Sequence, residues 1–93
     1  MAPDMERSDI VLSQQGRDKG RLMMVLDTDA EYLLLADGRR RRVERPKRKK
    51  IRHVSFVAKS HSEEGRRLRQ GEKLSNSEVR RALRQEEAPT NAE

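Results

Sequence analysis

The chain contains no cysteine and no tryptophan among its 93 residues, and it has only one tyrosine and one phenylalanine. The lack of cysteine excludes disulfides, thiolate zinc sites and thiol nucleophiles. Because aromatic side chains are almost absent, a hydrophobic core must be built from Leu, Val, Ile and Met. A core of this size contributes roughly 3–5 kcal/mol at such a length, so we expect a bound partner to add stability.

Long apolar runs are also missing. No stretch approaches the roughly 18 consecutive apolar residues of a membrane-spanning helix. The first residues, up to Asp9, are polar and acidic, which is unlike a signal peptide. We therefore expect a cytoplasmic protein without a membrane partner.

The residue patterns of catalytic and cofactor sites are missing as well. The sequence has neither a G-x-S-x-G elbow nor an H-E-x-x-H motif, and residues 16–20 match neither a Walker A loop nor a dinucleotide fingerprint. The two histidines, His53 and His61, and the scattered acids have no metal-ligand spacing. The sequence predicts a protein that is not an enzyme and that uses no cofactor, metal or small-molecule substrate.

Charge, in contrast, is abundant, and one segment holds most of the positive charge. Charged residues make up 41% of the chain, against roughly 25% in ordinary globular domains. Residues 39–52, which we call the basic segment, contain ten Lys/Arg and one acid, Glu44. The segment has a charge of +9, so the rest of the chain has −3, because the whole chain has +6. Such clustered charges repel one another unless a partner neutralises them, and polyphosphate backbones are the commonest partner.

Short apolar clusters separated by turn residues predict strands. The clusters lie at residues 10–12, 22–26, 32–35, 43 and 51–57, and Asp37-Gly38 is a strong hairpin signal between them. Pro46 is expected to end the strand that contains Val43, because proline cannot donate to a ladder. This spacing predicts a mainly β fold, a small five-stranded antiparallel barrel over residues 8–57.

The arginines before Val43 conflict with this pattern. If Val43 points into the barrel, strict alternation also points Arg39 and Arg41 inward, and an unpartnered guanidinium is far too costly to bury. We expect these arginines at the rim of the barrel, with their stems covering it and their heads in water. A bulge after Gly38 that resets the register is the alternative.

The sequence after residue 57 is polar and predicts one short helix. Ser75 and Glu78 form a capping box, and Leu74 and Val79 supply the matching hydrophobic staple. A helix of this length is marginal alone, so we expect it to dock on the barrel or on a partner. The predicted organisation is therefore a disordered lead-in (1–7), the barrel (8–57), a polar linker (58–74), the helix (75–87) and a disordered tail (88–93).

Residues 8–25 resemble the KOW motif, the strand–loop–strand unit of many ribosomal and transcription-elongation proteins. The match comprises a first strand with Asp9, a polar turn with Gly16, the Asp18-Lys19-Gly20 step and a second apolar strand. Gly16 is expected to permit a positive φ in this turn. With the basic segment and the final helix, the chain resembles archaeal and eukaryotic-type large-subunit ribosomal KOW proteins and their short bacterial relatives.

The resemblance implies an SH3-like barrel that binds structured RNA, ribosomal RNA above all, in a ribosome- or translation-associated role. Arginine can bind phosphate bidentately and lysine acts as a point charge, so the residues suit a phosphate backbone. Base stacking is not expected, because Tyr32 and Phe56 are needed in or near the core. The candidate RNA-binding residues lie on a rigid loop (16–21), on a longer mobile loop (46–50) and in the rest of the basic segment: Arg17, Lys19, Arg21, Arg39, Arg40, Arg41, Arg42, Arg45, Lys47, Arg48, Lys49, Lys50, Arg52 and His53.

Two other interpretations stay open at this point. The chain could be an SH3-like protein-interaction module that docks on an acidic transcription or translation partner, with the helix at 76–87 as an apolar anchor. Residues 46–50 also have the composition of a nuclear localisation signal, a pattern with many false positives.

Overall fold

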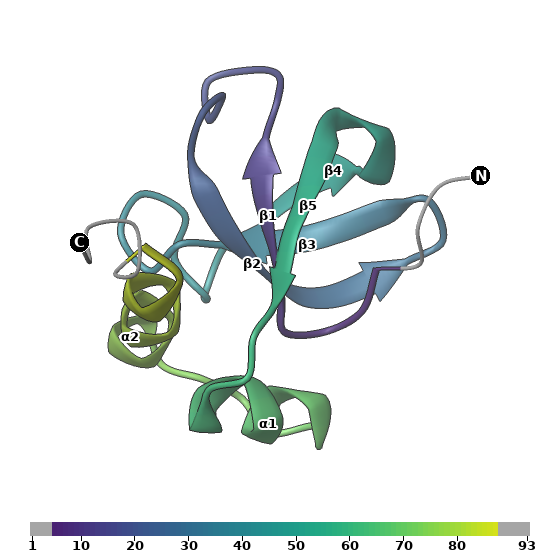
Figure 1. Cartoon of the computed structure of the whole chain (residues 1–93). Coiled ribbons are helices and arrows are strands. Elements are labelled where there is room, and N and C mark those ends of the chain that lie inside the picture. The colour runs from purple at the N-terminus through teal and green to yellow at the C-terminus, as the bar shows by residue number, and fades with distance from the viewer. Residues whose placement is uncertain (1–4, 88–93) are drawn as a thin grey trace.

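The computed structural model describes residues 5–87, which form a five-stranded antiparallel sheet and two helices (Figure 1). The predicted mainly β fold is confirmed. None of the helices in residues 5–87 has the length and apolar character needed to cross a membrane. The strands are β1 (Asp9–Ser13), β2 (Leu22–Asp29), β3 (Tyr32–Ala36), β4 (Lys47–Lys50) and β5 (Val54–Lys59); the helices are α1 (Glu63–Arg69) and α2 (Asn76–Glu87), and a 3₁₀ turn, η1 (Ile51–His53), joins β4 to β5.

The sheet is open. Its strand order is β4-β3-β2-β1-β5, so within the described residues β4 and β5 are two separate edges and the predicted closed barrel is not formed. Strand β4 ends after four residues, where the chain enters η1, and β4 and β5 do not pair with each other. Register shifts between Ile10 and Val11 and between Val25 and Asp27 bend the central strands. Lysine and arginine side chains along β4 discourage pairing of this edge with another chain.

The central strands bury side chains on both faces of the sheet. On one face, Val11 of β1 and Met23 of β2 pack with Leu33 and Leu35 of β3. On the other face, Ile10 pairs with Met24, and both pack against the helices. Burial on two faces explains why β2 begins with an unbroken apolar run rather than an alternating one.

Helix α2 forms as predicted and docks on the protein's own sheet. The Ser75 amide donates to Glu78 Oε1 at 2.9 Å, and the Glu78 amide donates to Ser75 Oγ at 3.2 Å, which is the capping box. Val79, Ala82 and Leu83 are buried in the cluster that contains Ile10 and Met24. The apolar face of α2 is therefore not available as an anchor for a partner.

The predicted linker at 58–74 contains a helix, α1. Ser62 Oγ accepts from the Gly65 amide at 3.0 Å and caps the helix N-terminus, where Glu63 and Glu64 also favour the helix dipole. Leu68, the single large apolar residue of α1, is buried in the cluster between helices and sheet. One well-placed leucine and a good cap are enough here because α2 and the sheet supply the rest of the core.

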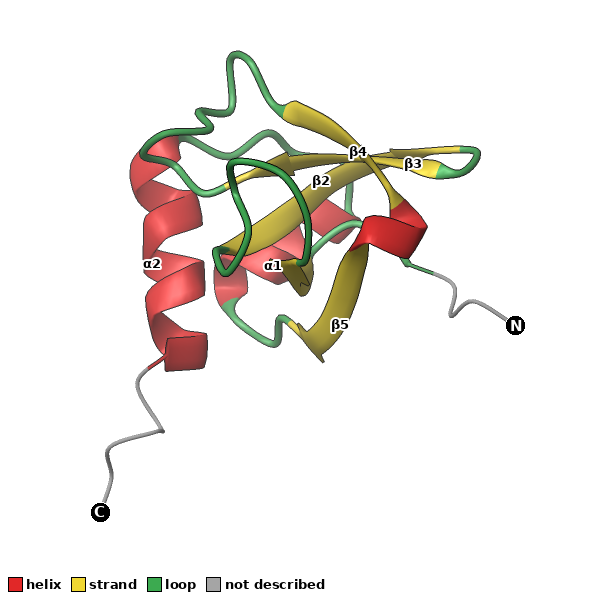
Figure 2. Ribbon diagram, turned by 90° about the horizontal axis from the view of Figure 1, so that it is seen from above, coloured by secondary structure: helices red, strands yellow, loops and turns green. Residues whose placement is uncertain are grey.

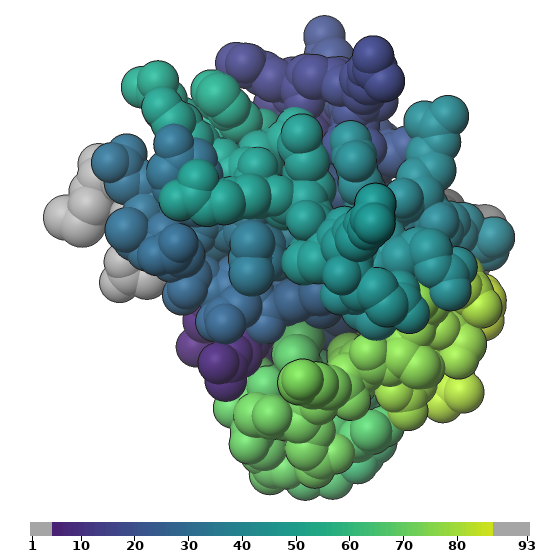
Figure 3. All heavy atoms as spheres, turned by 180° about the vertical axis from the view of Figure 1, so that it is seen from behind, coloured from purple at the N-terminus to yellow at the C-terminus, as the bar shows by residue number. Residues whose placement is uncertain are grey.

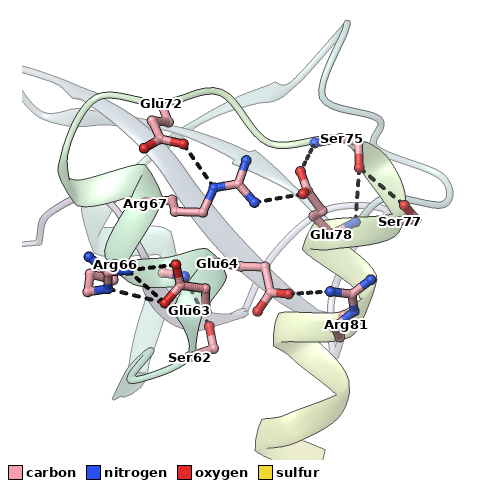
Figure 4. A network of polar contacts seen from close by, with 11 residues as sticks. Ser62, Glu63, Glu64, Arg66, Arg67, Glu72, Ser75, Ser77, Glu78 and Arg81 are labelled. Atoms are coloured by element: carbon pink, nitrogen blue, oxygen red, sulfur yellow. Dashed lines mark hydrogen bonds and ion pairs between the residues drawn. The ribbon is translucent and has the colours of Figure 1, made fainter.

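Ion pairs then join α1 to α2 (Figure 4). Arg67 reaches Glu72 at 2.9 Å and Glu78 at 2.7 Å, and Arg81 of α2 reaches the buried Glu64 of α1 at 2.8 Å. The hydrogen bond from Arg67 lowers the pKa of Glu78 below its usual value. Most charges of this helical unit (residues 59–87) are therefore used within the fold.

The basic segment also folds differently from the prediction. Residues 37–46 form a loop, so Asp37-Gly38 does not make a two-residue hairpin and Val43 is not in a strand. The Val43 amide, which a strand would use in a hydrogen bond to a neighbouring strand, donates instead to the side chain of Asn76 in α2, 2.8 Å from its Oδ1. The strand begins after Pro46 instead, and residues 47–50, predicted as a mobile loop, are β4.

The structure also corrects the predicted lead-in. Residues 1–4 and 88–93, part of the predicted disordered ends, lie outside the described residues. Residues 5–7, however, are in contact with the sheet: Met5 packs against the cluster that contains Val11 and Leu33, and Arg7 Nε lies 3.3 Å from Asp27 Oδ1.

Candidate nucleic-acid interface

The loop between β1 and β2, residues 14–21, presents two cations on a backbone that is held by its own hydrogen bonds. We call it the glycine loop. Gly16 has a φ of 83°, as predicted for this turn, and its carbonyl accepts from the Lys19 amide at 3.2 Å. The Arg21 amide donates to the Asp18 carbonyl at 2.9 Å. Arg17 and Lys19 are exposed at the outer side of this loop.

Two acids fasten the glycine loop to the loop before β4. Asp18, only 2% exposed, accepts from Arg41 Nε at 3.0 and 3.2 Å. In the second ion pair, the arginine is in the glycine loop and the acid is in the other loop: Arg21 Nη1 lies 3.5 Å from Asp37 Oδ2. Arg41 therefore lies outside both apolar clusters, as predicted, but its head binds a buried carboxylate rather than water alone.

Asp37 also shapes the loop that it belongs to. Its Oδ1 accepts from the amides of Arg39 and Arg41, both at 2.9 Å. The side chain thus satisfies two backbone donors that have no strand partner, which stabilises the turn over residues 37–41. The loop lies beside α2 (Figures 1 and 2), where the Arg80 guanidinium donates to the Gly38 carbonyl at 2.6 Å.

Lys49 is a structural residue, and its prediction as a surface RNA contact is wrong. It is 7% exposed, and its ammonium donates to Ser13 Oγ at 2.9 Å and to the Gln15 carbonyl at 2.5 Å. Burial lowers the pKa of Lys49. The alternation of β4 turns this side chain inward, so Lys49 ties β4 to the glycine loop.

Arg48, which precedes Lys49 in β4, covers an aromatic ring. The Arg48 guanidinium lies 3.6 Å from the centroid of Tyr32, and Arg48 Nη2 lies 3.6 Å from Asp29. Tyr32 is half-buried under this contact, whereas Phe56 is 49% exposed on β5. The prediction that Phe56 is needed in or near the core is therefore wrong.

Among the described ion pairs, the acid of the basic segment, Glu44, pairs with one of its neighbours, Arg42. Glu44 accepts from Asn76 Nδ2 at 3.0 and 3.2 Å, and this hydrogen bond lowers the pKa of Glu44. Glu44 therefore stays ionised and is directed toward Asn76 of α2, and its Oε1 lies 3.5 Å from Arg42 Nε.

The predicted RNA-binding residues therefore fall into distinct groups. Arg21, Arg41, Arg42 and Arg48 form ion pairs within the chain, Lys49 is buried, and His53 is half-buried in η1. In the view from behind, β4 and the loop before it (teal) spread across the middle of the face, below the glycine loop (purple) at the top (Figure 3). The remaining cations have no ion pair within residues 5–87, and we call them the unpaired cations: Arg17, Lys19, Arg39, Arg40, Arg45, Lys47, Lys50 and Arg52.

Sequence reasoning missed two arginines of α2. Arg80 and Arg84, at i and i+4, line a hollow of about 450 Å³ together with Arg21, Arg39 and Asp37. Their spacing on the predicted helix gives them a common face, which is the signal that could have placed them together. The rest of the hollow comes from residues 20–22 and from the loop before β4, where the sequence predicted a hairpin turn at Asp37-Gly38 and a strand containing Val43.

No protein-family model matches the chain, and a search of curated proteins finds none similar to it. The resemblance to KOW proteins thus depends on the quoted residues alone. Among residues 5–87 no three His, Asp or Glu side chains lie together as a metal site requires.

Proposed function

We propose that the protein is a KOW-like, ribosome- or translation-associated protein that binds the phosphate backbone of structured RNA, ribosomal RNA in the first place. The observation that carries the proposal is the set of eight unpaired cations on segments that are fixed relative to one another. Asp18 and Asp37 join the glycine loop to the loop before β4, and Lys49 joins it to β4. The cations are therefore presented by one scaffold rather than by separate flexible tails.

A rigid array of cations suits folded RNA for a physical reason. Double-stranded RNA is recognised mainly by shape, through phosphates and 2′-hydroxyls, because its major groove is too narrow for side chains. Cations that are already positioned lose less conformational entropy on binding than cations on a mobile loop. Because the unpaired cations lie close together without acids to neutralise them, they repel one another in the free protein. A bound polyanion removes that repulsion.

The salt dependence of binding to a stem-loop RNA tests this proposal. If about six phosphates are engaged, the slope of log K against log salt should be about −4 to −5, from roughly 0.7–0.9 per contact. The variant Lys19→Gln/Arg40→Gln should lose two contacts and bind about 25- to 60-fold more weakly at 0.1 M salt. Filter binding or a gel-shift series measures both quantities, and crosslinking in cells identifies the RNA.

Arg66→Gln/Lys73→Gln is the matched control, because it removes the same charge from exposed positions of the helical unit. We expect this variant to bind RNA within about threefold of the wild type. A flat salt dependence of the wild type, or equal losses in both double variants, contradicts the proposal.

One observation favours a second function, the docking of a protein partner. Phe56 and Val57 are 49% and 44% exposed on β5, which is a free edge of the sheet in the described residues. An extended segment of another chain could add to this edge and cover both side chains. A preparation free of nucleic acid at low salt, judged by its absorbance ratio at 260 and 280 nm, would favour this alternative.

A further inference from the structure

Four arginines from distant parts of the sequence meet at one hollow between α2 and the loops. Arg21 comes from the glycine loop, Arg39 from the loop before β4, and Arg80 and Arg84 from α2. The volume of about 450 Å³ is within the range of sites for small ligands. No aromatic side chain lines the hollow, so it has no platform on which a base would stack.

The charges around the hollow are not balanced within the protein. Asp37 is the single acid among the lining residues, against four guanidinium groups. Its Oδ1 is already occupied by two backbone amides, and its Oδ2 faces Arg21. Arg39 and Arg84 are exposed and have no ion pair with the described side chains, which end at Glu86. A bound anion would remove the repulsion among these arginines.

Two of the arginines are held in place before any ligand binds. Asp37 orients Arg21, and the Gly38 carbonyl holds Arg80 at 2.6 Å. The loop and helix are in close contact at Gly38, where a Cβ atom would lie 2.5 Å from the Asn76 carbonyl oxygen. The two exposed arginines, Arg39 and Arg84, can then close on the ligand from either side.

We propose that this hollow binds one phosphate group of the RNA, with Arg21 and Arg80 as fixed contacts and Arg39 and Arg84 as mobile ones. Planar guanidinium groups bind phosphate oxygens bidentately, which distinguishes the hollow from an array of lysine point charges. This inference rests on the proposed function for the source of the phosphate. That source is either a phosphodiester within the chain or a phosphate at its 5′ end.

A phosphate titration tests the site without RNA. In NMR spectra at constant ionic strength, inorganic phosphate should shift the Nε–H signals of Arg21, Arg39, Arg80 and Arg84 along a saturable curve. The Arg66 signal, from an exposed residue of α1, should change only weakly and linearly. If the four signals change in the same way as that of Arg66, the hollow is not a phosphate site.

RNA binding by Arg39→Gln/Arg84→Gln tests the source. Both side chains are exposed, so the variant should fold, and loss of one phosphate contact should weaken binding about five- to eightfold at 0.1 M salt. An equal loss with 5′-hydroxyl and 5′-monophosphate stem-loops assigns the hollow to an internal phosphodiester, and a loss confined to the 5′-monophosphate assigns it to the end. If the variant binds both RNAs like the wild type, the inference is wrong, while the proposed function stands. If the wild type binds no RNA but phosphate still saturates the hollow, the proposed function and the RNA assignment fail together.

Discussion

The two arginine-rich parts of this protein use their charges differently. In the helical unit, three of the six arginines, Arg66, Arg67 and Arg81, form ion pairs with glutamates of the same unit, and two more, Arg69 and Arg80, donate to acceptors elsewhere in the fold. In the basic segment, two of the cations, Arg42 and Arg48, pair with carboxylates near them, and Arg41 reaches Asp18. The unpaired cations outnumber these three.

Cations with an ion pair in the protein stabilise the fold, whereas cations without one are available to bind a partner. A paired arginine contributes to stability, and its loss should be measured in the unfolding equilibrium. An unpaired arginine contributes little to folding or opposes it through repulsion, and its loss should be measured in binding. Substitutions in the two parts should therefore affect different measurements, and four substitutions, in these parts or in the segments that contact them, test this division.

Asp9 is an acid whose pairing is incomplete, and it gives the largest expected change in stability. It is 2% exposed, its Oδ1 accepts no hydrogen bond, and Lys59 Nζ lies 3.7 Å away. Burial raises the pKa of Asp9 to about 6, although the charge of Arg69 opposes this. The folded protein thus holds the proton more tightly than the unfolded chain does, so stability falls as the pH rises from about 4 to about 6.

Asp9→Asn should remove this effect. We expect the free energy of unfolding at pH 8 to be about 1–3 kcal/mol higher for the variant than for the wild type. Screening of the carboxylate by water reduces this difference toward the lower value. The difference should vanish below about pH 4. Urea unfolding at several pH values measures it, and Asp27→Asn, at an exposed position paired with Arg7, is the control. Equal stability of Asp9→Asn and wild type at pH 8 would show that the ionised carboxylate is well compensated.

Asp18→Asn tests whether the unpaired cations need their scaffold. Loss of the charged contact with Arg41 should cost about 2 kcal/mol of folding stability. RNA affinity should also fall, although the variant gains positive charge, because the glycine loop and the loop before β4 are no longer held together. Stability by urea unfolding and affinity by filter binding, on the same samples, separate the two effects. Tighter RNA binding by the variant would mean that net charge alone governs affinity.

Local signals allowed part of this architecture to be predicted. The capping box at Ser75 and Glu78, the apolar run of β2 and the positive φ of Gly16 each depend on a few neighbouring residues. Such features follow from the chain itself, so β1, β2, β3 and α2 were found in the right places.

Features that depend on distant partners were not predicted. The residues 47–50 have no apolar pattern, and they form a strand because β3 offers a free edge and Lys49 finds acceptors at Ser13 and Gln15. Val43 is held by Asn76, 33 residues further along. The hollow needs three segments at once, so no pattern along one of them could reveal it.

Arg67→Gln tests the other side of the comparison. Arg67 joins Glu72 and Glu78, and its side chain is 29% exposed. We expect a melting temperature lower by about 5 °C and an unchanged RNA affinity. Because the hydrogen bond from Arg67 lowers the pKa of Glu78, its contribution is present at neutral pH and lost as the pH falls below the ordinary glutamate value, so the two melting temperatures should converge in acid.

Arg66→Gln is the control for this variant, because the Arg66–Glu63 pair lies within one helix and both side chains are more than half exposed. It should lower the melting temperature by less than about 2 °C. A larger effect than that of Arg67→Gln would mean that pairing between the helices adds nothing beyond pairing within one.

The smallest effect is expected from Ser75→Ala. Ser75 is exposed, and its Oγ accepts the Glu78 amide at 3.2 Å, so the substitution removes one N-cap acceptor and should cost about 0.5–1 kcal/mol. Ser77→Ala is the matched control, because among the described contacts Ser77 Oγ meets only Ser75 Oγ at 3.1 Å. Ser75→Ala should leave the RNA salt slope unchanged, since the cap acts at one end of α2 and carries no charge. A changed slope would mean that fraying of α2 reaches Asn76 and releases the loop at Val43, and the two arginine-rich parts would then be one mechanical unit rather than two.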